Sequence, residues 1–319
     1  MDINDQAGFP HRLYRGVIDE QRLFGSLVVK TSWTVIDGQI TLDPVQDWAI
    51  LDAPKPTPDG IVASDQCFFK AGADVMLLGQ AASANPVEHM SVSIAIGELF
   101  NASIHVVGRR LWRKRLLRGL EISPPEKFTT MPLTLRHAFG GKVVWDELPI
   151  PYPDNPEGMG YYHDVAGADG QPLPNLEDPA HLIAHWDDRP EPVGLGLRPM
   201  AFGPHLRRAI AFDDKGILST LDPMFFNSAF PACIARDATA GQAVRVAGAL
   251  PGSAWIFTLP ACPLRAEITV GNATHALGMR YDQIWLEPET GKVRIAWRSP
   301  FRYHLRALER RLVKLERVA

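Results

Sequence analysis

Apolar side chains recur at every second position along the first third of the chain, which is typical of β-strands. The alternation runs through Leu27–Val35 and returns in Ser91–Gly97. Asp37 and Gly38 separate two apolar runs, and an Asp-Gly pair in that place is a strong signal for a two-residue hairpin turn. We therefore predict an antiparallel β-rich part over residues 1–135.

The middle of the chain, residues 136–230, shows no clear period and carries closely spaced turn signals. The stretch Met131–Gly203 is crowded with Gly, which permits positive φ, and with Pro, which fixes φ. Aromatic residues throughout this stretch argue against disorder, because they can anchor loops onto a core. Asp178 followed by Pro179 is typical of a helix start, so we predict one short helix there. We expect an ordered, irregular segment.

The last part, residues 231–319, returns to alternation and then changes period. Ile284 and Leu286 match Val293 and Ile295 across a turn, which predicts a second hairpin. Beyond Phe301 the leucines are spaced 3, 4 and 3 residues apart, which is the period of an amphipathic helix. These are Leu305, Leu308, Leu312 and Leu315.

The fold class that these patterns predict is mainly β. Two antiparallel β-rich parts, sandwich- or barrel-like, are joined by an ordered Pro/Gly-rich middle, and an α-helix closes the chain. The three parts are 1–135, 136–230 and 231–319, and they are compatible with one compact unit.

Composition narrows the class of protein. Hydrophobic residues make up 46% of the 319 and charged residues 22%, which is typical of a globular protein with a sizeable core. The net charge of −3 gives no overall attraction to nucleic acid or to an anionic membrane. The 3 cysteines are odd in number and form no CxxC pair, which favours a reducing compartment. The N-terminus has no apolar signal-peptide core and no apolar run reaches membrane-spanning length, so we expect a cytoplasmic protein without membrane insertion.

Candidate catalytic and metal-binding residues form no complete motif. His181 and His185 would share one side of the predicted short helix, as zinc ligands do, but Leu182 stands where a zincin has Glu. His137, beside Arg136, needs a nearby carboxylate for acid–base work. Asp146 and Glu147 are the candidates for it; the alternative is a pair that hydrogen-bonds loop carbonyls.

Motifs for phosphate binding, cysteine nucleophiles and nucleic-acid binding are incomplete as well. The glycine pairs at 140–141 and 194–196 match neither the dinucleotide nor the Walker pattern. Cys67, Cys233 and Cys262 lack a nucleophile signature and are expected to be small core residues. The basic run 109–118 is read as a solvated strand edge rather than a nucleic-acid patch. We therefore predict no cofactor, no metal and no nucleic-acid partner.

A series of short sequence segments resembles segments of a family of bacterial accessory proteins of the type VI secretion system. This family is catalogued as a domain of unknown function. The proteins of this family are often encoded beside VgrG, PAAR and pentapeptide-repeat proteins. The matching segments are LVVKTSWTV, KAGADVMLLGQA at 70–81, VVGRRLW at 106–112, MPLTLRHAFGGK at 131–142, NPEGMGYY at 155–162, LPNLEDP at 173–179, LRPMAFGP at 197–204, FFNSAF at 225–230 and YDQIWLEPETGKVRIAWR at 281–298.

The resemblance implies an adaptor or chaperone without enzymatic activity, which loads a secreted effector, or its PAAR-containing region, onto the VgrG spike. The aromatic loops of the middle part, with Phe202, Tyr161 and Tyr162, are then a docking face. The leucine stripe from Leu305 to Leu315 is a second candidate for partner binding, although docking onto the β body explains it equally. Two alternatives stay open: a hydrolase-type enzyme with carboxylates on the middle loops, and a structural protein that self-assembles through the leucine stripe.

Overall fold

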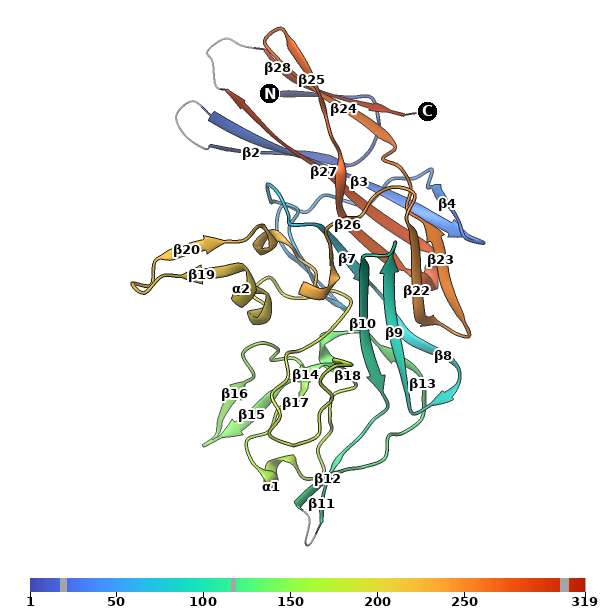
Figure 1. Ribbon diagram of the computed structural model, residues 1–319, viewed down its shortest axis with the longest axis vertical. Helices are drawn as coiled ribbons and strands as arrows, with labels where there is room; N and C mark the ends of the chain where they lie inside the picture. Colours follow the sequence, from blue (N-terminus) through green and yellow to red (C-terminus); the bar gives the residue numbers. More distant parts are fainter. Residues whose placement is uncertain (18–21, 116–118, 305–309, 319) are drawn as a thin grey trace.

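The largest sheet of the molecule combines strands from both ends of the chain. The computed structural model describes residues 1–17, 22–115, 119–304 and 310–318. Seven strands form this sheet in the order β2-β3-β27-β26-β7-β21, with β4 paired to β3 (Figure 1). Their bounds are His11–Val17 (β2), Arg22–Ile36 (β3), Gln39–Leu42 (β4), Ala73–Leu77 (β7), Ile234–Ala235 (β21), Arg280–Glu287 (β26) and Lys292–His304 (β27). The hairpins predicted at Asp37-Gly38 and across the turn that contains Gly291 are both present.

A second sheet has five strands in the order β18-β10-β9-β22-β23. Their bounds are Leu176–Glu177 (β18), Phe100–Val107 (β10), His89–Ile96 (β9), Ala243–Leu250 (β22) and Ser253–Thr258 (β23). The alternating residues Val92, Ile94 and Ile96 are buried in one core cluster with residues of the first sheet such as Leu77 and Ile295. The apolar faces of the two sheets thus share the main core, as in a β-sandwich.

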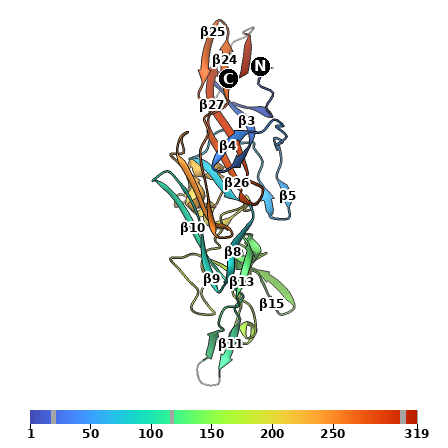
Figure 2. The same ribbon diagram turned by 90° about the vertical axis from the view of Figure 1, so that its right-hand side faces the viewer.

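A small third sheet joins the two ends of the chain. Its order is β1-β28-β24-β25, with bounds Asp2–Asp5, Arg311–Arg317, Leu264–Val270 and Ala273–Leu277. Strand β1 runs parallel to β28. Figures 1 and 2 place this sheet at one end of an elongated molecule and the hairpin of β11 (Trp112–Arg115) and β12 (Gly119–Ile122) at the other.

The predicted C-terminal helix is wrong for the described residues. Residues 301–304 continue β27, and Arg311–Arg317 form β28, where Val313 and Leu315 are buried on one face at period two. Strands β1 and β24 supply backbone partners on both sides of β28, and this tertiary pairing outweighs the helical spacing of the leucines. Leu305 and Leu308 lie outside the described residues.

The middle segment is ordered, as predicted, around its own small core of Trp112, Phe139, Ala168, Leu173 and Ile183. It contains two α-helices, α1 (Val165–Ala168) and α2 (Gly203–Ala209). The helix predicted after Asp178 is wrong. The Asp178 carboxylate accepts the amide of Ala180, and the Asp188 carboxylate accepts two further amides, so local side-chain hydrogen bonds hold turns instead.

Short paired strands and 3-10 turns complete the fold. The strands are β5 (Lys55–Thr57) with β6 (Gly60–Val62), β8 (Gln80–Val87) with β13 (Phe128–Pro132), β14 (Phe139–Gly140) with β17 (Met159–Gly160), β15 (Lys142–Trp145) with β16 (Leu148–Pro151), and β19 (Ile210–Phe212) with β20 (Leu218–Leu221). The turns are η1 (Leu135–His137), η2 (Pro223–Phe226), η3 (Pro231–Cys233) and η4 (Pro288–Thr290). The mainly β prediction is confirmed, and no sheet formed by the described residues closes into a barrel.

Candidate functional site

Three loops of the Met131–Gly203 stretch meet around one groove. Residues 134–136, 155–157 and 197–199 line it together with 56–61 from the β5–β6 hairpin, and its volume is about 430 Å³. Each of the three loops belongs to a different one of the family-like segments in the Met131–Gly203 stretch. The fold therefore brings segments that are far apart in the chain to one place on the surface.

Asn155 links two of these loops by hydrogen bonds. Its side-chain amide is buried and donates to the carbonyls of Leu135 (2.8 Å) and Phe139 (3.0 Å). A Cβ on Gly140 would lie 2.1 Å from the Asn155 carbonyl oxygen, and Gly140 has φ of +149°. Only glycine fits there, since a side chain would separate the two loops.

Arg198 fixes the third loop to the core. Its buried guanidinium donates to the carbonyls of Ala229 (2.7 Å) and Asn227 (2.6 Å), and burial lowers its pKa to about 10. Near the groove mouth, Arg136 and Glu157 form an exposed ion pair at 3.7 Å, which contributes little to stability. The groove is thus rigid and has prolines along its walls, and it suits an apolar side chain better than it suits acid–base chemistry.

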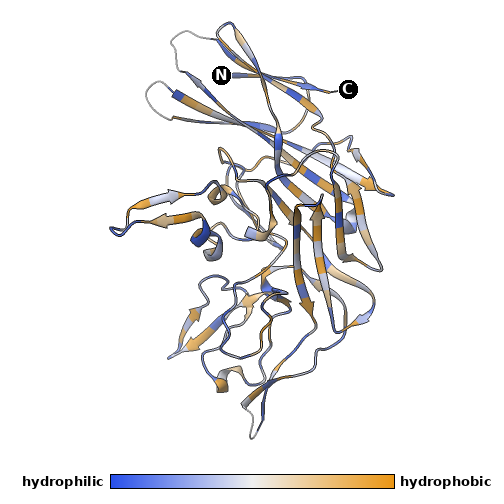
Figure 3. Cartoon of the chain, viewed as in Figure 1, coloured by the Kyte–Doolittle hydropathy of each residue, from blue (hydrophilic) through white to orange (hydrophobic). Residues whose placement is uncertain are grey.

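Two hairpins expose apolar side chains on the side of the body that lies to the left in Figure 1. The hairpin β15–β16 exposes Val144, Trp145, Leu148 and Ile150; the hairpin β19–β20 exposes Phe212, Ile217, Leu218 and Leu221. Figure 3 shows the hydrophobic colour on both ribbons. Isolated two-stranded ribbons are marginally stable in water, and neighbouring exposed apolar side chains are typical of interaction sites.

The β19–β20 hairpin owes its apolar face to a bulge. Ala211 pairs with Thr220, but Phe212 pairs with Leu218, which leaves Ser219 as the extra residue. The extra residue brings Leu218 onto the same face as Leu221, although the two are three positions apart. The ribbon therefore has one apolar face.

The residues predicted to bind a partner are mostly interior. Phe202 and Leu315 are each 1% exposed and pack in core clusters. Tyr161 and Tyr162 are half-buried, and the Tyr162 hydroxyl donates to the Pro172 carbonyl at 2.6 Å. Leu312 is half-buried beside Leu315 in β28. The exposed apolar residues of the two hairpins were not predicted from the sequence.

The structure keeps the candidate catalytic residues apart. His137 contacts Asn175 at 3.0 Å, whereas Asp146 and Glu147 form the exposed tip of the β15–β16 hairpin. His181 lies 3.4 Å from the Asp178 carboxylate at an exposed turn. Within the described ranges, no group of three His, Cys, Asp or Glu side chains is placed to hold a metal ion. The absence of metal and catalysis stays a prediction.

Two further candidates are explained by burial. Burial raises the pKa of Cys67 to about 11 and that of Cys233 to about 12, so both thiols are suited to packing rather than to nucleophilic attack. In the basic run, Arg110 turns inward and pairs with the buried Glu177 at 2.9 Å, while Arg115 pairs with Glu121. The run is therefore not a uniform basic surface, and residues 116–118 lie outside the described part of the chain.

A buried network of charges was not foreseen from the sequence. It contains three cations and three carboxylates: Lys30, Lys70, Arg298, Asp65, Asp74 and Asp282. Arg298 donates two hydrogen bonds, of 2.7 and 3.0 Å, to the Asp282 carboxylate. Lys70 forms ion pairs with both Asp282 (3.2 Å) and Asp74 (2.8 Å). Burial opposes ionisation of Asp282, but Arg298 and Lys70 outweigh it and lower its pKa to about 2.

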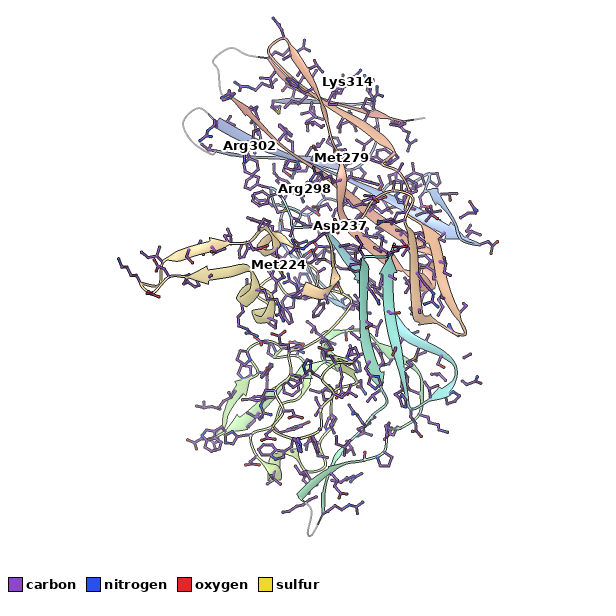
Figure 4. All side chains as sticks on the ribbon, viewed as in Figure 1. Met224, Asp237, Met279, Arg298, Arg302 and Lys314 are labelled. Atoms are coloured by element: carbon purple, nitrogen blue, oxygen red, sulfur yellow. The ribbon has the colours of Figure 1, made fainter. Side chains whose placement is uncertain are left out.

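The network forms part of the wall of an open cleft of about 600 Å³. Arg298, Asp237 and Met279, labelled in Figure 4, line this cleft. The Arg298 guanidinium also donates to Ser26 and to two carbonyls, so its hydrogen-bonding capacity is spent within the protein. With equal numbers of both charges, the network ties β27, β26 and the loop before β7 together and leaves no surplus charge for a ligand.

In comparisons with known proteins, the sequence matches the model of one protein family. Residues 20–298 match the model of a family described as an uncharacterized protein conserved in bacteria (DUF2169). No curated protein matches the chain, and no solved structure does. Neither described α-helix, the longer being Gly203–Ala209, has the length and apolarity that a bilayer-spanning helix needs. Since the match covers most of the sequence, the chain belongs to this bacterial family of uncharacterized proteins.

Proposed function

We propose that this protein is a non-catalytic adaptor, which binds a type VI secretion effector or its PAAR-containing region and helps to load it onto the VgrG spike. The observation that carries the proposal is the pair of hairpins with uncovered apolar faces, β15–β16 and β19–β20. Faces of this kind mark protein interaction sites. The choice of a type VI effector and VgrG as partners rests on the resemblance of the sequence segments to type VI accessory proteins.

The interior of the molecule supports a binding role. Its buried charges pair with one another, and its candidate acid–base residues lie on separate elements. The groove of the middle segment adds a rigid apolar pocket that can receive a side chain of the bound protein. The adaptor would act in the bacterial cytoplasm, before the spike is assembled.

The experiment compares effector capture by two variants in a bacterium that encodes the system. One carries Trp145→Ser, Leu148→Ser, Phe212→Ser and Leu218→Ser, which makes both hairpins polar. The matched control carries Leu99→Ser and Ile256→Ser, at exposed apolar positions away from these hairpins. We expect the first variant to lose co-purification of effector and VgrG and to abolish effector secretion, with an unchanged circular dichroism spectrum. The control should behave as wild type.

Two results would overturn the proposal. One is normal effector secretion from a strain that lacks the protein, with neither effector nor VgrG recovered alongside it. The other is hydrolytic turnover by the purified protein that is lost on substitution of carboxylates in the middle loops, which would favour an enzyme.

A further inference from the structure

The register of the β15–β16 hairpin places four apolar side chains on one face, while Val144 and Pro149 lie on the other. Val143 pairs with Ile150, and Trp145 pairs with Leu148. Cross-strand partners share a face, so all four side chains lie together. Trp145, Leu148 and Ile150 are 52%, 67% and 41% exposed. An exposed histidine, His163, contacts Trp145, with the two ring centroids 4.1 Å apart.

The outer edge of β16 is closed to further strands. The Tyr152 amide donates to the Gly141 carbonyl at 2.8 Å, which fixes the positions whose backbone groups point toward β15. By alternation, the nitrogens of Pro149 and Pro151 are those that point outward, and proline has no N–H to donate. A partner therefore binds the hairpin through the side chains of the apolar face and not by extending the sheet at β16.

The turn of the hairpin is acidic at a conformational cost. Asp146 and Glu147 have φ of +48° and +65°, as in a type I′ turn, where Asn-Gly is the favoured pair. Both carboxylates are exposed, and neither forms an ion pair with a residue that the structure describes. The chain thus places two free negative charges at the end of the apolar face, in a conformation that other residues would adopt more easily.

We propose that the β15–β16 hairpin binds an amphipathic segment of the partner protein, in which Lys or Arg flanks the apolar stripe. This inference rests on the proposed adaptor function and specifies the partner segment. The acidic turn is complementary to basic residues, and the apolar face takes the stripe. The four-residue strands span about 13 Å, and two turns of an α-helix span about 11 Å, so a short helix matches the face in length.

A second copy of the chain is the weaker candidate for the occupant. A stable dimer needs about 800 Å² of surface on each partner, far more than a hairpin of ten residues offers alone. Two copies meeting turn to turn would also bring four carboxylates together.

The test uses the full-length protein and two fluorescently labelled helical peptides, measured by anisotropy at low and high salt. Both peptides carry a leucine stripe, which lysines flank in one and glutamates in the other. We expect the lysine peptide to bind about tenfold tighter, and its affinity to fall with salt. Trp145→Ala should weaken binding about 30-fold, as loss of a central aromatic anchor does.

A double variant separates charge from folding. Asp146→Asn with Glu147→Gly installs the favoured turn pair, so Tm should hold or rise, while affinity for the lysine peptide falls about fivefold and loses much of its salt dependence. The matched control is Asp37→Asn, at the other turn with positive φ on an aspartate (+50°), and it should leave binding unchanged.

Three outcomes would overturn the inference: equal binding of both peptides, wild-type affinity of the double variant, or wild-type dimerisation in light scattering that Leu148→Asp abolishes. Each of these leaves the adaptor function standing if effector and VgrG are still captured in cells. Peptide binding as expected, with no effector or VgrG captured in cells, would instead remove the type VI assignment and keep the docking element.

Discussion

The buried charge network makes Asp282→Asn the most informative single change in this protein. The substitution keeps the shape of the side chain and removes one of three buried carboxylates that balance three buried cations. Arg298 loses the negative charge opposite it and one of its two acceptor oxygens, and Lys70 keeps only Asp74 as an ion-pair partner. Breaking a buried pair by removing one partner costs about 3–5 kcal/mol, because the remaining charge stays buried without compensation.

The pKa of Asp282 gives the part of this stabilisation that depends on pH. In the folded protein it is about 2, against a usual 3.8, which corresponds to about 2 kcal/mol of stability. Because the folded-state pKa is lowered, this stabilisation is fully present above pH 3.8 and is lost as pH falls toward 2. The wild-type protein should lose this contribution over that window, and the Asn variant, which has no carboxyl group to protonate at position 282, should decline less steeply.

Urea unfolding of both proteins at neutral pH and through the acid window measures both quantities. Asp52→Asn, which breaks an exposed pair with Arg12, serves as the control and should leave the urea midpoint nearly unchanged. An Asp282→Asn protein that unfolds at the wild-type midpoint, or whose stability declines between pH 4 and pH 2 as steeply as that of the wild type, would contradict this prediction.

Three further predictions concern the middle segment. Gly203→Ala should lower stability by about 1–3 kcal/mol in urea unfolding, because its Cβ would lie 1.9 Å from a carboxylate oxygen of Asp154. Pro149→Ala with Pro151→Ala should increase aggregation in light scattering at an unchanged Tm, since the outer edge of β16 regains its N–H groups. His205→Gln should flatten the loss of stability between pH 6.5 and pH 4, because burial, with Arg198 nearby, lowers the histidine pKa to about 4 and only the unfolded chain is protonated across that window.

Local pattern was a reliable guide where the partner strand is near in sequence. The alternation in Ser91–Gly97 became β9, and Ile284 and Val293 lie in the hairpin that their pattern predicted. The C-terminal segment shows the opposite case. Leu312 and Leu315 have helical spacing, yet Val313 and Leu315 also alternate, and β24 and β1 decided between the two periods. That decision depends on strands that no local window contains.

The candidate site was harder to foresee for two different reasons. Trp145 and Leu148 flank a two-residue turn, which is a readable hairpin signal, but Pro149 and Pro151 argue against a strand unless they lie on an outer edge. Lys70 and Asp282 are remote in sequence, and their pairing follows only from the parallel contact of β7 with β26. A single sequence carries the first signal and not the second.

The long ladder between β3 and β27 determines when this protein can fold. Every residue of β27 pairs with β3. Strand β3 is therefore synthesised early, while its longest neighbour, β27, is synthesised near the end of translation. At about 5–20 residues per second, a ribosome needs roughly 15–50 s to extend the chain from one to the other. During that time Leu27, Val28 and Val29, all fully buried in the native state, can pair with β2 but not with β27, their partner on the other side. One edge of β3 therefore stays open to aggregation until the C-terminal strands have been made.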